Sequence, residues 1–184
     1  MSRWHGWVVL AGLLAFGVAH ADSWVRPELR VVTSESGDYV ARIVPGDRKV
    51  HARALLYRYD AERDGYRKLA DYELQDGWAP VDVLLGDDGG LVTLDAWASM
   101  GQGTVLRVYD ADGGLRFGHS LAGLVGKRAS AAPASVSSLW WRCGKPTLTY
   151  GGEALRVMTW DEGELRVRLD DGSVQHDPGK GSCR

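Results

Sequence analysis

The stretch TVLRVYDADGG at residues 104–114 is an apolar run that breaks into an acidic turn containing glycine. The same pattern recurs as ALLYRYDAERDG at residues 54–65 and as EALRVMTWDEG at residues 153–163. The aspartates at these breaks, Asp60, Asp110 and Asp161, stand 50 and 51 residues apart. Self-similarity at a period of about 50 residues is typical of stacked or radial β units. The sequence therefore predicts an internal repeat.

Each repeat contains short runs of β-forming residues separated by glycine-containing breaks. In the second repeat the runs begin at Pro80, Leu91, Thr104 and Leu115. In the third they are SVSSLWW from Ser135, PTLTY from Pro146, EALRVMTW from Glu153 and ELRVRL from Glu164. Alternating apolar and polar residues in the last of these indicate a strand with one buried face. Helical spacing is confined to a turn at residues 121–128.

We therefore predict an all-β fold of three four-stranded antiparallel meanders of about 50 residues each, propeller-like or an open β-repeat. The units cover about residues 28–76, 78–128 and 134–174, followed by a C-terminal tail, in a single domain over residues 22–184. Propellers generally close with four to eight blades. Three units therefore leave an open stack, half of a ring completed by a second copy, or a sandwich or barrel as alternatives.

Two segments carry a family resemblance. GLVTLDAW at residues 90–97, followed by VYDADG at residues 108–113, resembles segments of uncharacterised exported bacterial proteins with β-propeller-like repeats. The resemblance covers mainly residues 80–120. It implies a fold and a compartment, and it implies no activity or site residue.

The N-terminus has the pattern of a secretory signal peptide over residues 1–21. Arg3 precedes the apolar stretch from Val8 to Val18, and Ala19-His20-Ala21 has the small residues of a cleavage site. About eleven apolar residues are too few to cross a bilayer, which needs about twenty. No second run of that length follows, so we expect no membrane span after cleavage and a periplasmic or secreted location.

The composition of the chain narrows the classes of possible binding partner. The formal net charge is -2, with acidic and basic residues interspersed, whereas nucleic-acid binding requires a basic face. The two cysteines, Cys143 and Cys183, form an even count in a chain predicted to be exported, which favours one disulfide. We expect a protein, peptide or glycan partner, with a second copy of the chain as a further candidate, and no nucleic acid.

The candidates for ligand binding are aromatic. Trp140 and Trp141 are adjacent on a predicted strand, which sends their side chains to opposite faces. An outward-facing Trp141, with Trp78, Trp97 and the neighbouring Arg142, is a candidate platform for a sugar, an aromatic group or a peptide. The alternative is that these rings fill the space between sheets, which is what large aromatic residues usually do.

Asp82 and Asp95 are weak catalytic candidates, because each interrupts an apolar strand and paired carboxylates do acid–base chemistry. Buried aspartates also hold turns. The Asp110-Ala-Asp112-Gly113 turn resembles the start of a calcium loop, but the position of the closing glutamate is Leu121. His51, His119 and His176 lack the spacing of metal ligands, and no nucleophile motif occurs. We predict no metal and no cofactor.

These features favour an exported β-repeat binding or interaction module of the bacterial envelope over an enzyme. Two alternatives remain open. One is an envelope hydrolase that uses Asp82 and Asp95, and the other is an accessory subunit that completes a partner's β ring.

Cleavage after Ala21 gives the first test. Because Ala19 and Ala21 supply the small residues required, mass spectrometry of the exported protein should find Asp22 at the mature N-terminus. A mature species that retains Trp4 and Trp7 would instead identify the apolar run as an anchor.

Overall fold

A computed structural model describes residues 23–179 and 183, so the predicted signal peptide lies outside the described residues. The chain is all-β, as predicted, and forms three four-stranded antiparallel sheets with meander order. The first sheet contains β1 (Arg30–Thr33), β2 (Tyr39–Val44), β3 (Arg53–Asp60) and β4 (Gly65–Glu73). The second contains β5 (Pro80–Leu85), β6 (Leu91–Ala96), β7 (Thr104–Tyr109) and β8 (Leu115–Ser120). The third contains β9 (Arg142–Leu148), β10 (Ala154–Thr159), β11 (Glu164–Arg168) and β12 (Val174–Asp177).

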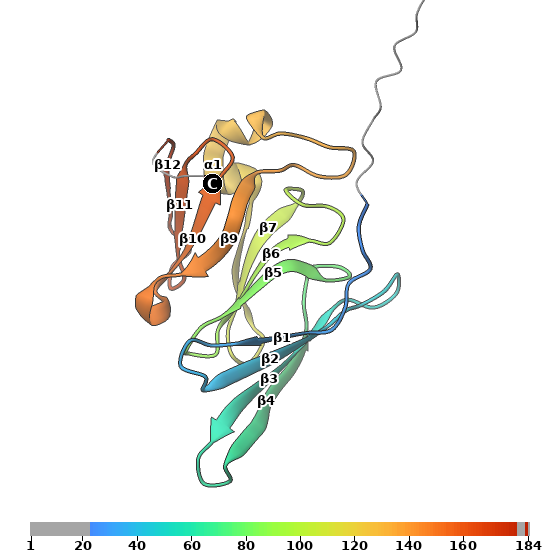
Figure 1. The fold of residues 1–184 in the computed structure, drawn as a ribbon, viewed down its shortest axis with the longest axis vertical. Helices are drawn as coiled ribbons and strands as arrows, with labels where there is room; N and C mark the ends of the chain where they lie inside the picture. The colour runs from blue at the N-terminus through green and yellow to red at the C-terminus, as the bar shows by residue number, and fades with distance from the viewer. Residues whose placement is uncertain (1–22, 180–182, 184) are drawn as a thin grey trace, which may run out of the picture.

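The β5–β8 sheet lies between the other two sheets (Figure 1). One core fills the space between the first and second sheets and includes Ile43, Leu56 and Leu91. A second core fills the space between the second and third sheets. There Leu155 and Val157 on β10 pair in register with Val167 and Leu165 on β11, while the arginines that alternate with them face away. Period-2 alternation thus buries one face of the third sheet.

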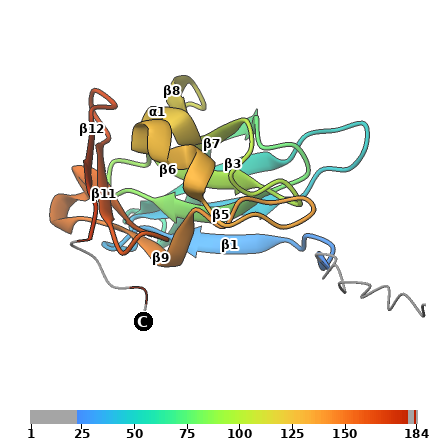
Figure 2. The same ribbon diagram turned by 90° about the horizontal axis from the view of Figure 1, so that it is seen from above.

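A short helical segment closes the second sheet, as the sequence predicted. Helix α1 (Leu121–Val125) is capped by Ser120, whose Oγ accepts a hydrogen bond from the N–H of Gly123 at 3.1 Å. A 3-10 helix, η1 (Gly126–Ala131), follows. Leu121, Leu124 and Val125 pack into the core between the second and third sheets. Figure 2 shows α1 beside the strands of the second sheet.

The four strands of the third sheet lie about one strand later in the sequence than predicted. The SVSSLWW run from Ser135 forms an irregular connection with one bridge between Ala134 and Leu139, and the fourth strand is Val174–Asp177 from the predicted tail. β12 was missed because it has four residues with one aliphatic side chain, too little for a periodic signal. Asp161 consequently lies between the second and third strands of its sheet, whereas Asp60 is the last residue of a third strand and Asp110 directly follows one.

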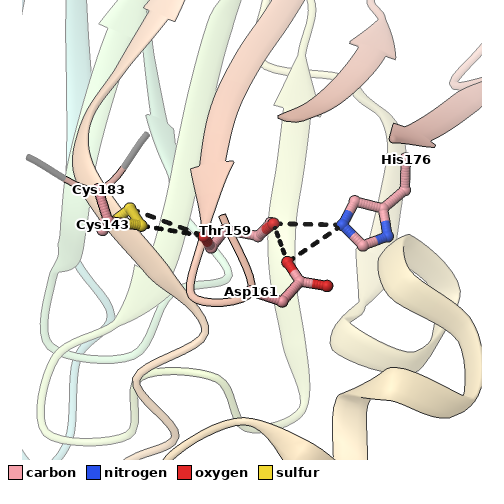
Figure 3. The surroundings of a disulfide bond; sticks show 5 residues. All are labelled: Cys143, Thr159, Asp161, His176 and Cys183. Atoms are coloured by element: carbon pink, nitrogen blue, oxygen red, sulfur yellow. Dashed lines mark hydrogen bonds and ion pairs between the residues drawn. A yellow bond between two sulfur atoms is a disulfide. The ribbon is translucent and has the colours of Figure 1, made fainter. Parts of the chain in front are cut away.

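The predicted disulfide is confirmed. The sulfur atoms of Cys143 and Cys183 lie 1.98 Å apart, with Cα atoms 5.5 Å apart (Figure 3). Cys143 lies in β9 rather than in the predicted turn. Because β9 and β12 are the two edges of the third sheet, the bond ties the segment after one edge strand to the other edge strand. A helix long and apolar enough to cross a membrane is not found among the described residues.

The β7–β8 turn gives a test of sheet packing. Gly113 has φ 94°, and a Cβ atom there would lie 2.3 Å from Cγ of Tyr72 on β4. We expect Gly113→Ala to lower the free energy of unfolding by about 2 kcal/mol or more, through backbone strain and this clash. Urea denaturation measures the change.

Gly103→Ala is the matched control. Gly103 also has positive φ, at 63°, but a Cβ atom there would have no described neighbour within 4 Å. A loss at position 113 no larger than that at position 103 would contradict the predicted contact between the first two sheets.

Candidate functional site

Three tryptophans gather at one end of the sheets. The connections β2–β3, β4–β5 and β6–β7 meet at this end, together with the segment that precedes β1 (Figure 1). Trp24 comes from the segment before β1, Trp78 from the β4–β5 connection and Trp97 from the β6–β7 connection. The structure thus brings together two of the predicted platform residues, Trp78 and Trp97, and adds Trp24.

The three indoles form an ordered cluster. The Trp78 and Trp97 rings stack with centroids 4.9 Å apart and an interplanar angle of 5°. Trp24 meets Trp97 edge-on at 6.2 Å. Nε1 of Trp97 donates to the carbonyl oxygen of Val25 at 2.9 Å, and Nε1 of Trp24 donates to Oγ of Ser137 at 3.3 Å. These bonds fix both rings while leaving all three partly exposed.

The cluster lines an open cavity of about 500 Å³. This volume lies within the range of small-ligand sites, roughly 300–1,000 Å³. Its wall combines aromatic and charged side chains: Trp24, Arg26, Asp47, Arg48, Lys49, Trp78 and Trp97. Sequence reasoning missed the charged members. The available signal was the run Asp47-Arg48-Lys49 directly after Pro45-Gly46.

The loop that carries Trp97 has an unusual backbone. Asp95 and Ala98 have φ values of 55° and 62°, which non-glycine residues rarely adopt. Such conformations cost about 1–3 kcal/mol each and persist where the surroundings fix them. Here Oδ1 of Asp95 accepts hydrogen bonds from the N–H of Gly101 and from Nε1 of Trp141, each at 2.8 Å. The buried carboxylate therefore holds the loop that positions Trp97.

Asp82 and Asp95 lie near each other, as expected, but with an arginine between them. Nε of Arg142 donates to Oδ2 of Asp95 at 2.9 Å, and Nη2 lies 2.6 Å from Oδ2 of Asp82. This second contact is an ion pair without hydrogen-bond geometry. Asp95 is fully buried and Arg142 nearly so. A guanidinium that bridges both carboxylates fits a structural anchor better than an acid–base pair.

Trp141 is not part of the exposed platform, which corrects the sequence prediction. Its side chain is 0% exposed and packs in the core, with the Arg142 guanidinium 5.8 Å from its ring centroid. Trp140 is the outward-facing member of the pair, at 42% exposure. Sequence alternation predicted opposite faces but did not say which ring is buried.

A second buried carboxylate, Asp76, was not anticipated. It accepts hydrogen bonds from Thr93 Oγ1 at 3.0 Å, from the hydroxyl of Tyr109 at 3.3 Å and from Nη1 of Arg107 at 2.8 Å. Burial raises the pKa of Asp76, although Arg107 and the hydroxyl donors oppose the rise. In the sequence Asp76 precedes Gly77 and looks like an ordinary turn residue.

His176, Asp161 and Thr159 form a polar cluster in the third sheet (Figure 3). Thr159 Oγ1 donates to Oδ1 of Asp161 at 2.6 Å and lies 3.2 Å from Nε2 of His176. Asp161 also pairs with Arg128 at 2.9 Å. Burial raises the pKa of Asp161, but these contacts together hold it below its usual value. The Thr159 hydroxyl is fully buried, so the cluster holds β12 against the β10–β11 turn.

Asp110 and Asp112 stabilise the β7–β8 turn. Oδ1 of Asp112 accepts a hydrogen bond from the N–H of Gly114 at 3.0 Å, and Asp110 forms an ion pair with Arg116.

The remaining two histidines lie apart from each other. His119 Nε2 lies 2.9 Å from the carbonyl oxygen of Gly172, and His51 lies in the β2–β3 connection. Across residues 23–179 and 183, no group of three or more His, Cys, Asp or Glu side chains is arranged to hold a metal ion.

No protein-family model matches the chain, and no curated protein sequence is significantly similar to it. Among solved structures, the chain is similar to a periplasmic gluconolactonase from Pseudomonas aeruginosa, with 19% identity and a TM-score of 0.43. The match covers 79% of this chain and 38% of that chain. Similarity of this degree transfers no residue role and no reaction.

The Asp95 anchor gives a test by substitution. Removing one partner of a buried ion pair costs about 3–5 kcal/mol, because the other charge stays buried. We expect Asp95→Asn to lower the free energy of unfolding by about that amount. Asp82→Asn should cost far less, since Asp82 is partly exposed and Arg142 keeps Asp95. Equal losses in urea denaturation of the two variants would contradict an anchor centred on Asp95.

Proposed function

We propose that the protein is an exported β-repeat binding module of the bacterial envelope whose ligand, a carbohydrate, occupies the cavity formed by Trp24, Trp78 and Trp97. The observation that carries this proposal is the cluster of three partly exposed indoles around a cavity of about 500 Å³. The apolar C–H face of a sugar ring packs against an indole, while the rim of such a cavity supplies polar contacts.

The rigidity of the cluster supports binding. The Trp97 loop is fixed by Asp95, and the indole N–H groups of Trp24 and Trp97 are bonded within the protein. A site built in advance loses little conformational entropy when a ligand arrives. The predicted signal peptide and the Cys143–Cys183 disulfide favour an exported location, because disulfides persist in oxidising compartments.

An accessory role in assembly is the second candidate, and one sheet face favours it. On the side of the first sheet that faces away from the second, Val31 is 56% exposed. Register places it on the same face as Leu55 and Tyr57, with Arg42 between Val31 and Leu55. The free face of the third sheet carries two arginines, Arg156 and Arg166. Sedimentation of the mature protein distinguishes a dimer from a monomer.

Trp97→Ala tests the binding site. Loss of the central ring should weaken binding of an oligosaccharide that the native protein binds by at least about tenfold, or about 1.4 kcal/mol. Binding is measured on a glycan array and then by titration calorimetry. Trp140→Ala is the matched control, since Trp140 is exposed but does not line the cavity.

Equal losses in both variants, or unchanged binding by Trp97→Ala, would contradict the proposed site. Hydrolysis of an envelope glycan that Asp82→Asn abolishes in a folded protein would favour the hydrolase instead.

A further inference from the structure

The tryptophan cavity has a charge opposite to that of the whole protein. Arg26, Arg48 and Lys49 line it with one carboxylate, Asp47, which leaves a formal charge of +2. The full chain has a formal net charge of -2. Positive charge is therefore concentrated beside the three indoles, and a concave, partly apolar wall strengthens the field of such a group of charges.

The three cations are not used in ion pairs of the fold. Within residues 23–179 and 183, none of them lies within 4.0 Å of an Asp or Glu oxygen. Asp47 forms no ion pair with them, and its Oδ1 accepts the backbone N–H groups of Lys49 at 2.7 Å and Val50 at 3.1 Å. That carboxylate instead shapes the turn that carries Arg48 and Lys49 to the cavity.

Backbone contacts fix this turn relative to the tryptophans. The N–H of Gly46 donates to the carbonyl oxygen of Trp78, and the N–H of Asp47 donates to that of Val50, both at 2.8 Å. A Cβ atom at Gly46 would lie 2.1 Å from the Val50 oxygen, so only glycine allows this close approach. The cationic turn and the Trp78 ring are thus parts of one ordered unit, unlike the solvated charges of a mobile loop.

We propose that the ligand is an acidic carbohydrate, a uronic-acid oligosaccharide whose ring packs on the tryptophans and whose carboxylate is bound by Arg26, Arg48 and Lys49. This inference rests on the proposed carbohydrate-binding function and adds the charge of the ligand. Guanidinium and ammonium groups form charge-assisted hydrogen bonds with carboxylates. A concave cavity beside stacked rings suits a sugar better than a flat anionic lipid surface.

Matched ligands separate charge from ring recognition. Titration calorimetry should use trimers of glucuronate, galacturonate and mannuronate, each as the free acid and as its methyl ester. At least one free acid should bind about tenfold more tightly than its ester, and the difference should shrink as salt rises from 0.05 to about 0.5 M, where exposed charges are screened.

A double variant, Arg48→Gln with Lys49→Gln, tests the residues. It should weaken binding of the acid about tenfold and binding of the ester less than about twofold. Arg67→Gln is the control: Arg67 is an exposed cation on β4 outside the cavity, and its loss should leave both affinities unchanged. Unchanged melting temperatures show that both variants fold.

The outcomes are distinct. Equal affinity for acid and ester overturns the charge inference but supports the carbohydrate site. Binding of neither form of any trimer overturns the uronic-acid ligand, and absence of binding to every sugar of the glycan array overturns the carbohydrate site as well. Binding only to vesicles that contain phosphatidylglycerol, abolished by the double variant, overturns the sugar ligand and assigns the cations to an anionic lipid surface.

Discussion

The buried ion pair between Asp95 and Arg142 is the interaction on which the rest of the structure depends. Asp95 is the last buried residue of β6 and Arg142 begins β9, so the pair joins the second sheet to the third. The same carboxylate binds the Trp141 indole and the N–H of Gly101. Desolvating these charges is costly, and the ion pairs of Arg142 and the hydrogen bonds to Asp95 offset that cost. A single residue therefore sets sheet docking and the shape of the Trp97 loop.

The interface between the first and second sheets uses the same device. Asp76, which follows β4, binds Thr93 on β6 together with Arg107 and Tyr109 on β7. Apolar side chains alone allow neighbouring sheets to slide, because hydrophobic attraction has no direction. A buried carboxylate that is bonded to donors at fixed positions is satisfied in only one relative position of the two sheets. Two such anchors on either side of the middle sheet give a short repeat chain a defined geometry.

The sequence revealed the fold wherever β-forming runs were long enough and were bounded by glycine-containing breaks. All four strand starts of the second sheet follow the predicted runs, whereas β12 has too few residues to show a pattern. The site was predicted only in part. Trp78 and Trp97 meet as expected, but the burial of Trp141 depends on Asp95, which lies 46 residues away. Contacts of this kind arise from sheet docking, which strand patterns do not encode.

The two ends of the sheets differ in a way that explains where a site can form. In a meander, alternate connections lie at opposite ends. The β3–β4, β5–β6 and β7–β8 connections share one end and are tight acidic turns closed by glycine. The β2–β3, β4–β5 and β6–β7 connections share the other end and carry the cationic turn and the tryptophans. Two of the three repeated acidic turns, at Asp60 and Asp110, therefore lie at the end opposite the cavity, and the irregular connections at the other end form the cavity.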